Sequence, residues 1–142
     1  MIDTIFTLLI ASILYTNSNY RDAYVSQNKE LILNGFIYLD NKNNRTPDEI
    51  CYHSSFLCLK ANYSNNPYTK LSYFNQGYKA LNALIQKHPL NVEYRFHRYK
   101  IEENAPAFLI VTNHTASDLI FIKKGLKQSN PIYQTILKQI KN

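Results

Sequence analysis

NPYTKLSYFNQGYKALNALIQKHPLNVEYRFHRYKIEENAPAFL, residues 66–109, is the stretch of this sequence that decides its fold. It contains a long amphipathic segment, a break at Pro89, a second segment dense in Tyr, Phe and Arg, and a stop at Asn104-Ala105-Pro106. Apolar residues of the first segment recur three or four positions apart, which is the period of one helix face. They are Leu71, Phe74, Tyr78, Leu81 and Ile85. The pattern predicts two antiparallel helices joined by a short turn.

Five positions along the chain combine a capping residue with the start of a helical pattern. Thr46-Pro47-Asp48-Glu49 has the form of a capping box with proline at the first helical position. Asn66-Pro67 and Asn130-Pro131 repeat the order of cap and proline, and Asn91 and Thr115 are further possible caps. These starts predict helices near residues 47–62, 67–87, 91–102, 115–127 and 131–141, preceded by a helix over about 28–40 and a short helical turn near 20–26.

The fold class follows from these helices and from the absence of any segment with the two-residue period of a strand. We expect an all-α domain of about six to seven helices, arranged as antiparallel helical hairpins with tetratricopeptide-like right-handed packing. No 34-residue repeat is visible, so the architecture is that of hairpins and not of a repeat array. Helix 47–62 has apolar or small residues on two faces and is expected at the centre. Gly77 is expected where the backbone of a neighbouring helix comes close.

The N-terminus allows two interpretations. Residues 5–14, IFTLLIASIL, form an apolar run that is too short to span a bilayer but has the length of the apolar part of a signal peptide. Thr16 and Ser18 supply small residues before a cut after Ser18. Alternatively, this run is the first core helix. We therefore divide the chain into residues 1–18, a possible signal peptide or first core helix, and residues 19–142, a single helical domain. Export, to the periplasm or as a secreted protein, is favoured over a cytoplasmic location.

The charge pattern bears on the partners of the protein. The 142 residues carry a net charge of +6, from 12 Lys and 4 Arg against 10 acidic residues. The lysines are scattered, whereas a nucleic-acid surface concentrates charge on one face and uses arginine. We expect no nucleic acid partner and no stable membrane span. The local cluster Lys123, Lys124 and Lys127 leaves open weak attachment to anionic surfaces.

Cysteine and histidine residues show no arrangement that predicts a disulfide, a metal site or a cofactor. Cys51 and Cys58 lie seven positions apart in one predicted helix, which places their Cα atoms ~10 Å apart, beyond the ~7 Å reach of a disulfide. None of the four histidines has a partner at metal-ligand spacing. The sequence also has no Gly-x-Ser-x-Gly elbow and no phosphate-binding glycine loop.

One group of residues combines charge with aromatic neighbours and is the candidate binding site. It consists of Tyr94, Arg95, Arg98 and Tyr99. An arginine beside tyrosines could anchor an anion. Alternatively, the arginines are structural and brace the end of their helix near Asn104-Ala105-Pro106, because a guanidinium group has five donors for such contacts.

Several motifs together resemble a known family. They are Asn66-Pro67, Lys70-Leu71-Ser72-Tyr73-Phe74, Gly77, the run HPLNVEYRF at residues 88–96 and NAPAFL at residues 104–109. This pattern is similar to that of a family of small, uncharacterised, exported bacterial proteins that are all-helical. The match extends from about Tyr20 to Asp118, with Ile110-Val111 in place of a Gly-Tyr pair and no basic residue at the start of the signal region. The resemblance implies an all-helical fold and export, and it implies no particular activity.

These observations predict a non-enzymatic helical-hairpin protein, a protein-interaction or adaptor module that acts outside the cytoplasm. The alternative function is that of a small-ligand binder or an enzyme that uses Arg95, Arg98 and the neighbouring tyrosines.

Overall fold

The computed structural model describes residues 17–140. Within this range it contains seven α-helices, one short 3-10 helix and no strand, which confirms the all-α prediction. In chain order the elements are α2 (Asn17–Ser26), α3 (Lys29–Asp40), α4 (Pro47–Ala61), α5 (Pro67–Lys87), α6 (Val92–Asn104), η1 (Ala107–Leu109), α7 (Thr115–Gly125) and α8 (Tyr133–Ile140). The predicted signal peptide or first core helix, residues 1–18, lies outside the described residues apart from Asn17 and Ser18, which begin α2.

Three of the predicted helix starts are confirmed by their capping hydrogen bonds. The Thr46 hydroxyl accepts from the Glu49 amide at 3.3 Å, and the Glu49 carboxylate accepts from the Thr46 amide at 3.0 Å. Asn66 caps α5 and Asn91 caps α6, each through its side-chain oxygen. Because each cap satisfies backbone amides that have no partner inside the helix, these contacts depend only on local sequence.

One predicted cap and one predicted start differ from the structure. Helix α7 begins at Thr115, as predicted, but the cap position is His114, and Asp118 in the first turn is completely buried. The C-terminal helix begins at Tyr133 instead of Pro131, because Asn130 accepts from the Ile132 amide and holds a turn there.

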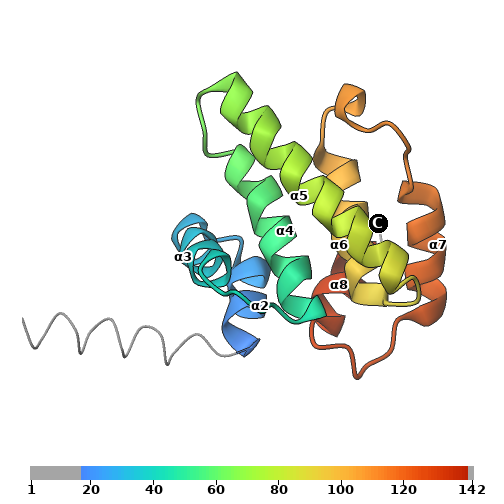
Figure 1. The fold of residues 1–142 in the computed structure, drawn as a ribbon. Coiled ribbons are helices and arrows are strands. Elements are labelled where there is room, and N and C mark those ends of the chain that lie inside the picture. The colour runs from blue at the N-terminus through green and yellow to red at the C-terminus, as the bar shows by residue number, and fades with distance from the viewer. Residues whose placement is uncertain (1–16, 141–142) are drawn as a thin grey trace, which may run out of the picture.

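Helix α4 occupies the centre of the fold, as its two covered faces predict. It contacts α2, α3, α5 and α6 (Figure 1). Its aromatic residues Tyr52 and Phe56 are fully buried, and so are the small residues Cys51 and Ser54. A helix that is buried on opposite faces needs neighbours on both sides, and α4 has them.

Helix α5 packs against α4 through Gly77. A Cβ atom at this position would lie 2.5 Å from the Ser54 carbonyl oxygen and 2.7 Å from the Cys58 sulfur. The glycine therefore permits the close approach that its place on the helix predicts.

The apolar stripe of α5 is buried only in part. Leu81 and Ile85 are buried, whereas Leu71 is 44% exposed, so the assignment of Leu71 to the core stripe is wrong.

The core is formed by side chains from all seven described α-helices. Its buried members include one or more residues of each helix, for example Tyr20, Ile32, Phe56, Leu81, Phe96, Ile122 and Ile136. A second, smaller cluster of Cys58, Ala61 and Phe74 lies between α4 and α5.

Candidate functional site

Arg98, a member of the predicted binding site, is buried in the interface between α6 and α7. Its Nε and Nη2 atoms donate to the two oxygens of Asp118 at 2.7 and 2.8 Å, and its Nη1 atom donates to the Asn82 side chain at 3.1 Å. The Asp118 carboxylate has no exposed surface. Because its guanidinium group is occupied by partners on α5 and α7, Arg98 holds three helices together.

Arg95 binds the same carboxylate from the next turn of α6. Its Nη1 atom lies 3.0 Å from Asp118, and its Nε atom donates to the Pro89 carbonyl at 2.7 Å. Both guanidinium groups thus bind within the protein, which is the kind of contact that the second interpretation of the sequence expects. The partners of the two arginines differ from the predicted ones. Both arginines bind Asp118, Arg98 also binds Asn82, and Arg95 also binds Pro89. None of these partners is at the C-terminal end of α6.

The two tyrosines of the predicted site point to other partners. The Tyr94 hydroxyl donates to Asp48 at 2.5 Å, and the Tyr99 hydroxyl donates to Glu103 at 3.1 Å. Burial is the main cause that raises the pKa of both phenols. The structure therefore does not bring Tyr94, Arg95, Arg98 and Tyr99 together around one open site.

A second polar network joins α2, α4 and α6 and also has a structural role. Arg21 binds Asp48 at 2.9 Å and Glu93 at 3.2 Å. The Tyr52 hydroxyl donates to the buried Glu93 carboxylate. Burial, together with the charge of Glu93, raises the pKa of Tyr52, so its phenol stays protonated and keeps this bond. Every buried charge of this network has a partner, as the cost of burying charge requires.

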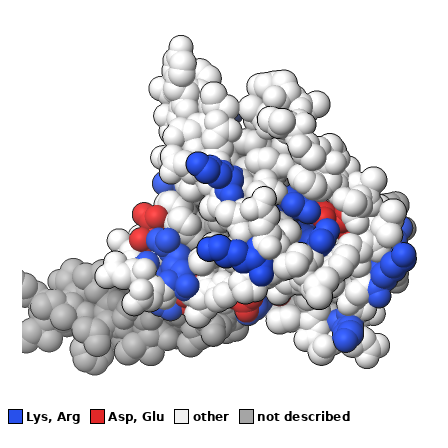
Figure 2. All heavy atoms as spheres, turned by 45° about the vertical axis from the view of Figure 1, so that its right-hand side comes forward, with Lys and Arg blue, Asp and Glu red and all other residues white. Residues whose placement is uncertain are grey.

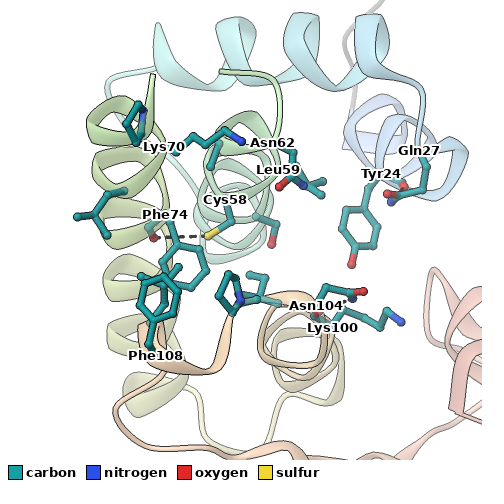
Figure 3. Close-up of a pocket in the computed structure, with 18 of the residues that line it drawn as sticks. Tyr24, Gln27, Cys58, Leu59, Asn62, Lys70, Phe74, Lys100, Asn104 and Phe108 are labelled. Carbon is teal, nitrogen blue, oxygen red and sulfur yellow. Dashed lines mark hydrogen bonds between the residues drawn. The ribbon is translucent and has the colours of Figure 1, made fainter. Parts of the chain in front are cut away.

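An apolar cavity of about 790 Å³ lies between α4, α5 and the C-terminal end of α6. In Figure 3, Tyr24 of α2 and Gln27, just after this helix, lie across the cavity from Phe74 of α5 and Phe108 of η1. Its lining includes Tyr24, Ser55, Cys58, Lys70, Leu71, Phe74, Lys100 and Phe108. We call this space the apolar cavity.

The charge and exposure of the lining give the apolar cavity its chemical character. Lysine is the only charged residue type in the described lining, which includes Lys70 and Lys100 and no Asp or Glu. Lys100 contacts Glu103 at 2.6 Å, whereas Lys70 is exposed. Phe108 is 85% exposed and Leu71 is 44% exposed, so apolar surface continues from the cavity to the outside of the protein.

Cys58 on the cavity wall is a buried thiol with a raised pKa. Its sulfur lies 3.7 Å from the Phe74 carbonyl oxygen, to which it donates. Burial raises the pKa of the thiol to about 12. Because the thiolate is the reactive species, this pKa disfavours a role for Cys58 as a nucleophile at neutral pH. Cys51 and Cys58 are both free and buried, in agreement with the prediction from their spacing.

A buried contact between Ser55 and His97 resembles half of a catalytic triad but has the wrong proton arrangement. The Ser55 oxygen lies 2.6 Å from His97 Nδ1 and donates to the Cys51 carbonyl at 2.9 Å. With its one proton so placed, Ser55 accepts from a protonated Nδ1. The other ring nitrogen, Nε2, then carries no proton. It has no hydrogen-bond partner among the described residues, so it is an acceptor without a donor and not a donor without an acceptor. Burial also lowers the pKa of His97 to about 3. His97 therefore orients Ser55 and does not activate it.

The described part of the chain, residues 17–140, contains no group of three or more His, Cys, Asp or Glu side chains that could hold a metal ion. In the same range no helix is long and apolar enough to cross a membrane.

Comparisons with family models, curated proteins and solved structures found no match to this chain. The resemblance to the exported helical family therefore stays a prediction.

The sequence alone does not predict the apolar cavity, because the residues that line it come from segments far apart in the chain. Tyr24 and Phe108, which line opposite walls, are separated by 84 positions. The one local signal is Leu71, which lies on the apolar stripe of α5 although it is 44% exposed in the structure. An apolar residue at the end of a stripe can belong to a binding surface as well as to the core.

Proposed function

We propose that the protein is a non-enzymatic interaction module whose apolar cavity binds an amphipathic helical segment of another protein. The observation that supports this function most is the continuity of the cavity with exposed Phe108 and Leu71 at its mouth. Exposed apolar side chains around a groove are typical of sites that take up the apolar face of a helix. A tetratricopeptide-like arrangement of the α4–α5 hairpin and action outside the cytoplasm are part of the same proposal.

The charge of the cavity specifies the segment further. Lys70 and Lys100 line the cavity, which has no acidic lining residue, so an incoming helix would gain from acidic side chains beside its apolar face. The apolar face would fill the space between Tyr24 on one wall and Phe74 and Phe108 on the other (Figure 3). We therefore expect a partner segment with large apolar residues at helical spacing, flanked by Asp or Glu.

A small apolar molecule is the second candidate for the cavity. Its volume of about 790 Å³ lies within the range of ligand pockets. Ligand binding through Arg95 and Arg98 is less favoured in this proposal, because both guanidinium groups bind Asp118. An enzymatic function would need an activated group, and neither Cys58 nor Ser55 is one.

Photo-cross-linking in the native host tests the proposed function. A photoreactive residue at Phe108 should produce a discrete protein adduct, and the same residue at Val111, which is 99% exposed and outside the cavity lining, should not. Leu71→Asp should abolish the adduct, and Leu71→Ile should retain it. Equal adducts from positions 108 and 111 would overturn the proposal. A bound small molecule in the native mass spectrum, with no adduct at 108, would favour the second candidate.

A further inference from the structure

The surface of α7 and α8 is basic because its one acidic residue is turned inward. Between residues 104 and 140 the chain has four lysines, Lys123, Lys124, Lys127 and Lys138, and a single acidic residue, Asp118. Asp118 is completely buried and is neutralised by Arg95 and Arg98. Helix α5 likewise carries lysines and no acidic residue. The negative charge that would balance the lysines of α7 is thus inside the protein.

Arg95 fixes the turn between α5 and α6 beside α7. It donates to the Pro89 carbonyl in the turn, and its guanidinium carbon lies 4.2 Å from the centre of the Phe121 ring on α7. The two segments also come close at Gly125, where a Cβ atom would lie 2.9 Å from a methyl carbon of Val92. The turn and α7 therefore form one continuous surface with a defined geometry.

This surface exposes both lysines and apolar side chains. On α7, Ile120, Lys123 and Lys124 share one face, because they are three and four positions apart. Ile120 is 56% exposed, and Leu90 in the turn is 79% exposed beside the exposed Lys87. No ion pair among the described residues involves these three lysines. Figure 2, with the α7 side turned toward the viewer, shows Lys and Arg across the face and Asp or Glu at few places.

We propose that this basic face, defined as Lys87, Leu90, Ile120, Lys123 and Lys124, binds the surface of a bilayer that contains anionic phospholipids. Lysine side chains are attracted by the negative surface potential, and exposed apolar side chains enter the boundary between headgroups and acyl chains. A nucleic acid would favour arginine, and both arginines near this face are held by Asp118. An acidic protein would gain less from Leu90 and Ile120. The residues of the basic face are separate from those that line the apolar cavity.

Vesicle sedimentation with the protein of residues 19–142 and with the full chain tests the proposal. Both should bind vesicles of phosphatidylglycerol and phosphatidylcholine at low salt, bind pure phosphatidylcholine far less, and dissociate as salt is raised. Each lysine near an anionic surface changes affinity about fivefold. K123Q/K124Q should therefore bind anionic vesicles roughly 25-fold more weakly, and L90S/I120S should also weaken binding.

The matched control is K29E on α3, which lowers the net charge by two, as K123Q/K124Q does, on an exposed residue outside the basic face. It should bind almost like the parent, and all variants should keep the parental melting temperature. Equal weakening by K29E would overturn the proposal in favour of unspecific attraction by net charge. Unchanged binding by L90S/I120S, together with tight binding of duplex DNA that K123Q/K124Q abolishes, would overturn it in favour of a nucleic-acid surface.

Discussion

Arg98 and Asp118, twenty positions apart in the chain, form a two-point ion pair inside the interface between α6 and α7. The Arg98 side chain is 8% exposed and the Asp118 side chain is not exposed at all. The attraction between buried charges offsets the cost of removing them from water only when both partners are present and well placed. The position of α7 therefore depends on this pair.

Removal of either partner should destabilise the protein. Arg98→Met leaves the Asp118 carboxylate buried with only Arg95 as a charged partner, and we expect a loss of about 3 kcal/mol in the free energy of unfolding. Arg95→Met should cost less, because Arg98 still binds both carboxylate oxygens. Chemical denaturation measures both effects. Lys79→Met, on an exposed face of α5, is the control and should be nearly silent. If Arg98→Met unfolds at the same denaturant concentration as the control, the ion pair does not stabilise the protein and this prediction is wrong.

Gly77→Ala should be destabilising, although alanine is the better helix former by ~1 kcal/mol. The added Cβ would lie 2.5 Å from the Ser54 carbonyl oxygen, a backbone atom that can move only together with α4. We expect a net loss of about 1–3 kcal/mol from overpacking. Asn75→Ala, at an exposed position of the same helix, is the control for helix propensity. A Gly77→Ala variant that melts above the parent would contradict the close packing of α4 and α5.

Leu81 and Leu71 lie on the same predicted stripe but should respond differently to truncation. Leu81 is completely buried, so Leu81→Ala should cost roughly 2–5 kcal/mol through lost contacts and the cavity that remains. Leu71 is 44% exposed, so Leu71→Ala should cost far less. Equal thermal shifts of the two variants would show that Leu71 belongs to the core after all.

The stability of the protein should fall in acid because of His97. Burial lowers its pKa from the ordinary 6.5 to about 3 in the folded protein. Below pH 6.5 the unfolded chain binds a proton that the folded protein excludes, so stability present above pH 6.5 is lost as the pH falls toward 3. At pH 5 this loss is about 2 kcal/mol.

Denaturation at pH 7 and pH 5 measures this loss. His97→Asn should be less stable at pH 7, because the Ser55 contact is disturbed, but it should lose less stability between the two pH values. An unchanged pH dependence in this variant would assign the effect to other groups.

Export predicts a specific mass for the protein produced in its native host. The apolar run at residues 5–14 and the small residues Thr16 and Ser18 favour a cut after Ser18. This cut would remove only the first two residues of α2. Intact-mass measurement should show the loss of residues 1–18. A mature protein that still begins at Met1 would contradict export.

The helices and their starts could be predicted from the sequence because the interactions that form them are local. The capping box of Thr46 and Glu49 joins residues three positions apart, and the caps at Asn66 and Asn91 reach no further than three positions. The apolar period places one face of α5 against the core, and Gly77 marks the point of closest approach. Each of these signals lies within one or two turns of helix.

Only the tertiary structure decided which side chains meet across helices. Ser55 contacts His97 from 42 positions away, and Arg98 finds Asp118 across twenty. For this reason the sequence did not show that Arg95 and Arg98 share the Asp118 carboxylate, or that residues from distant helices line the apolar cavity. Helical period states which residues share a face, but the crossing angle and the depth of packing between two helices depend on the shapes of many side chains at once. The spacing of residues within one helix does not determine how these side chains pack together.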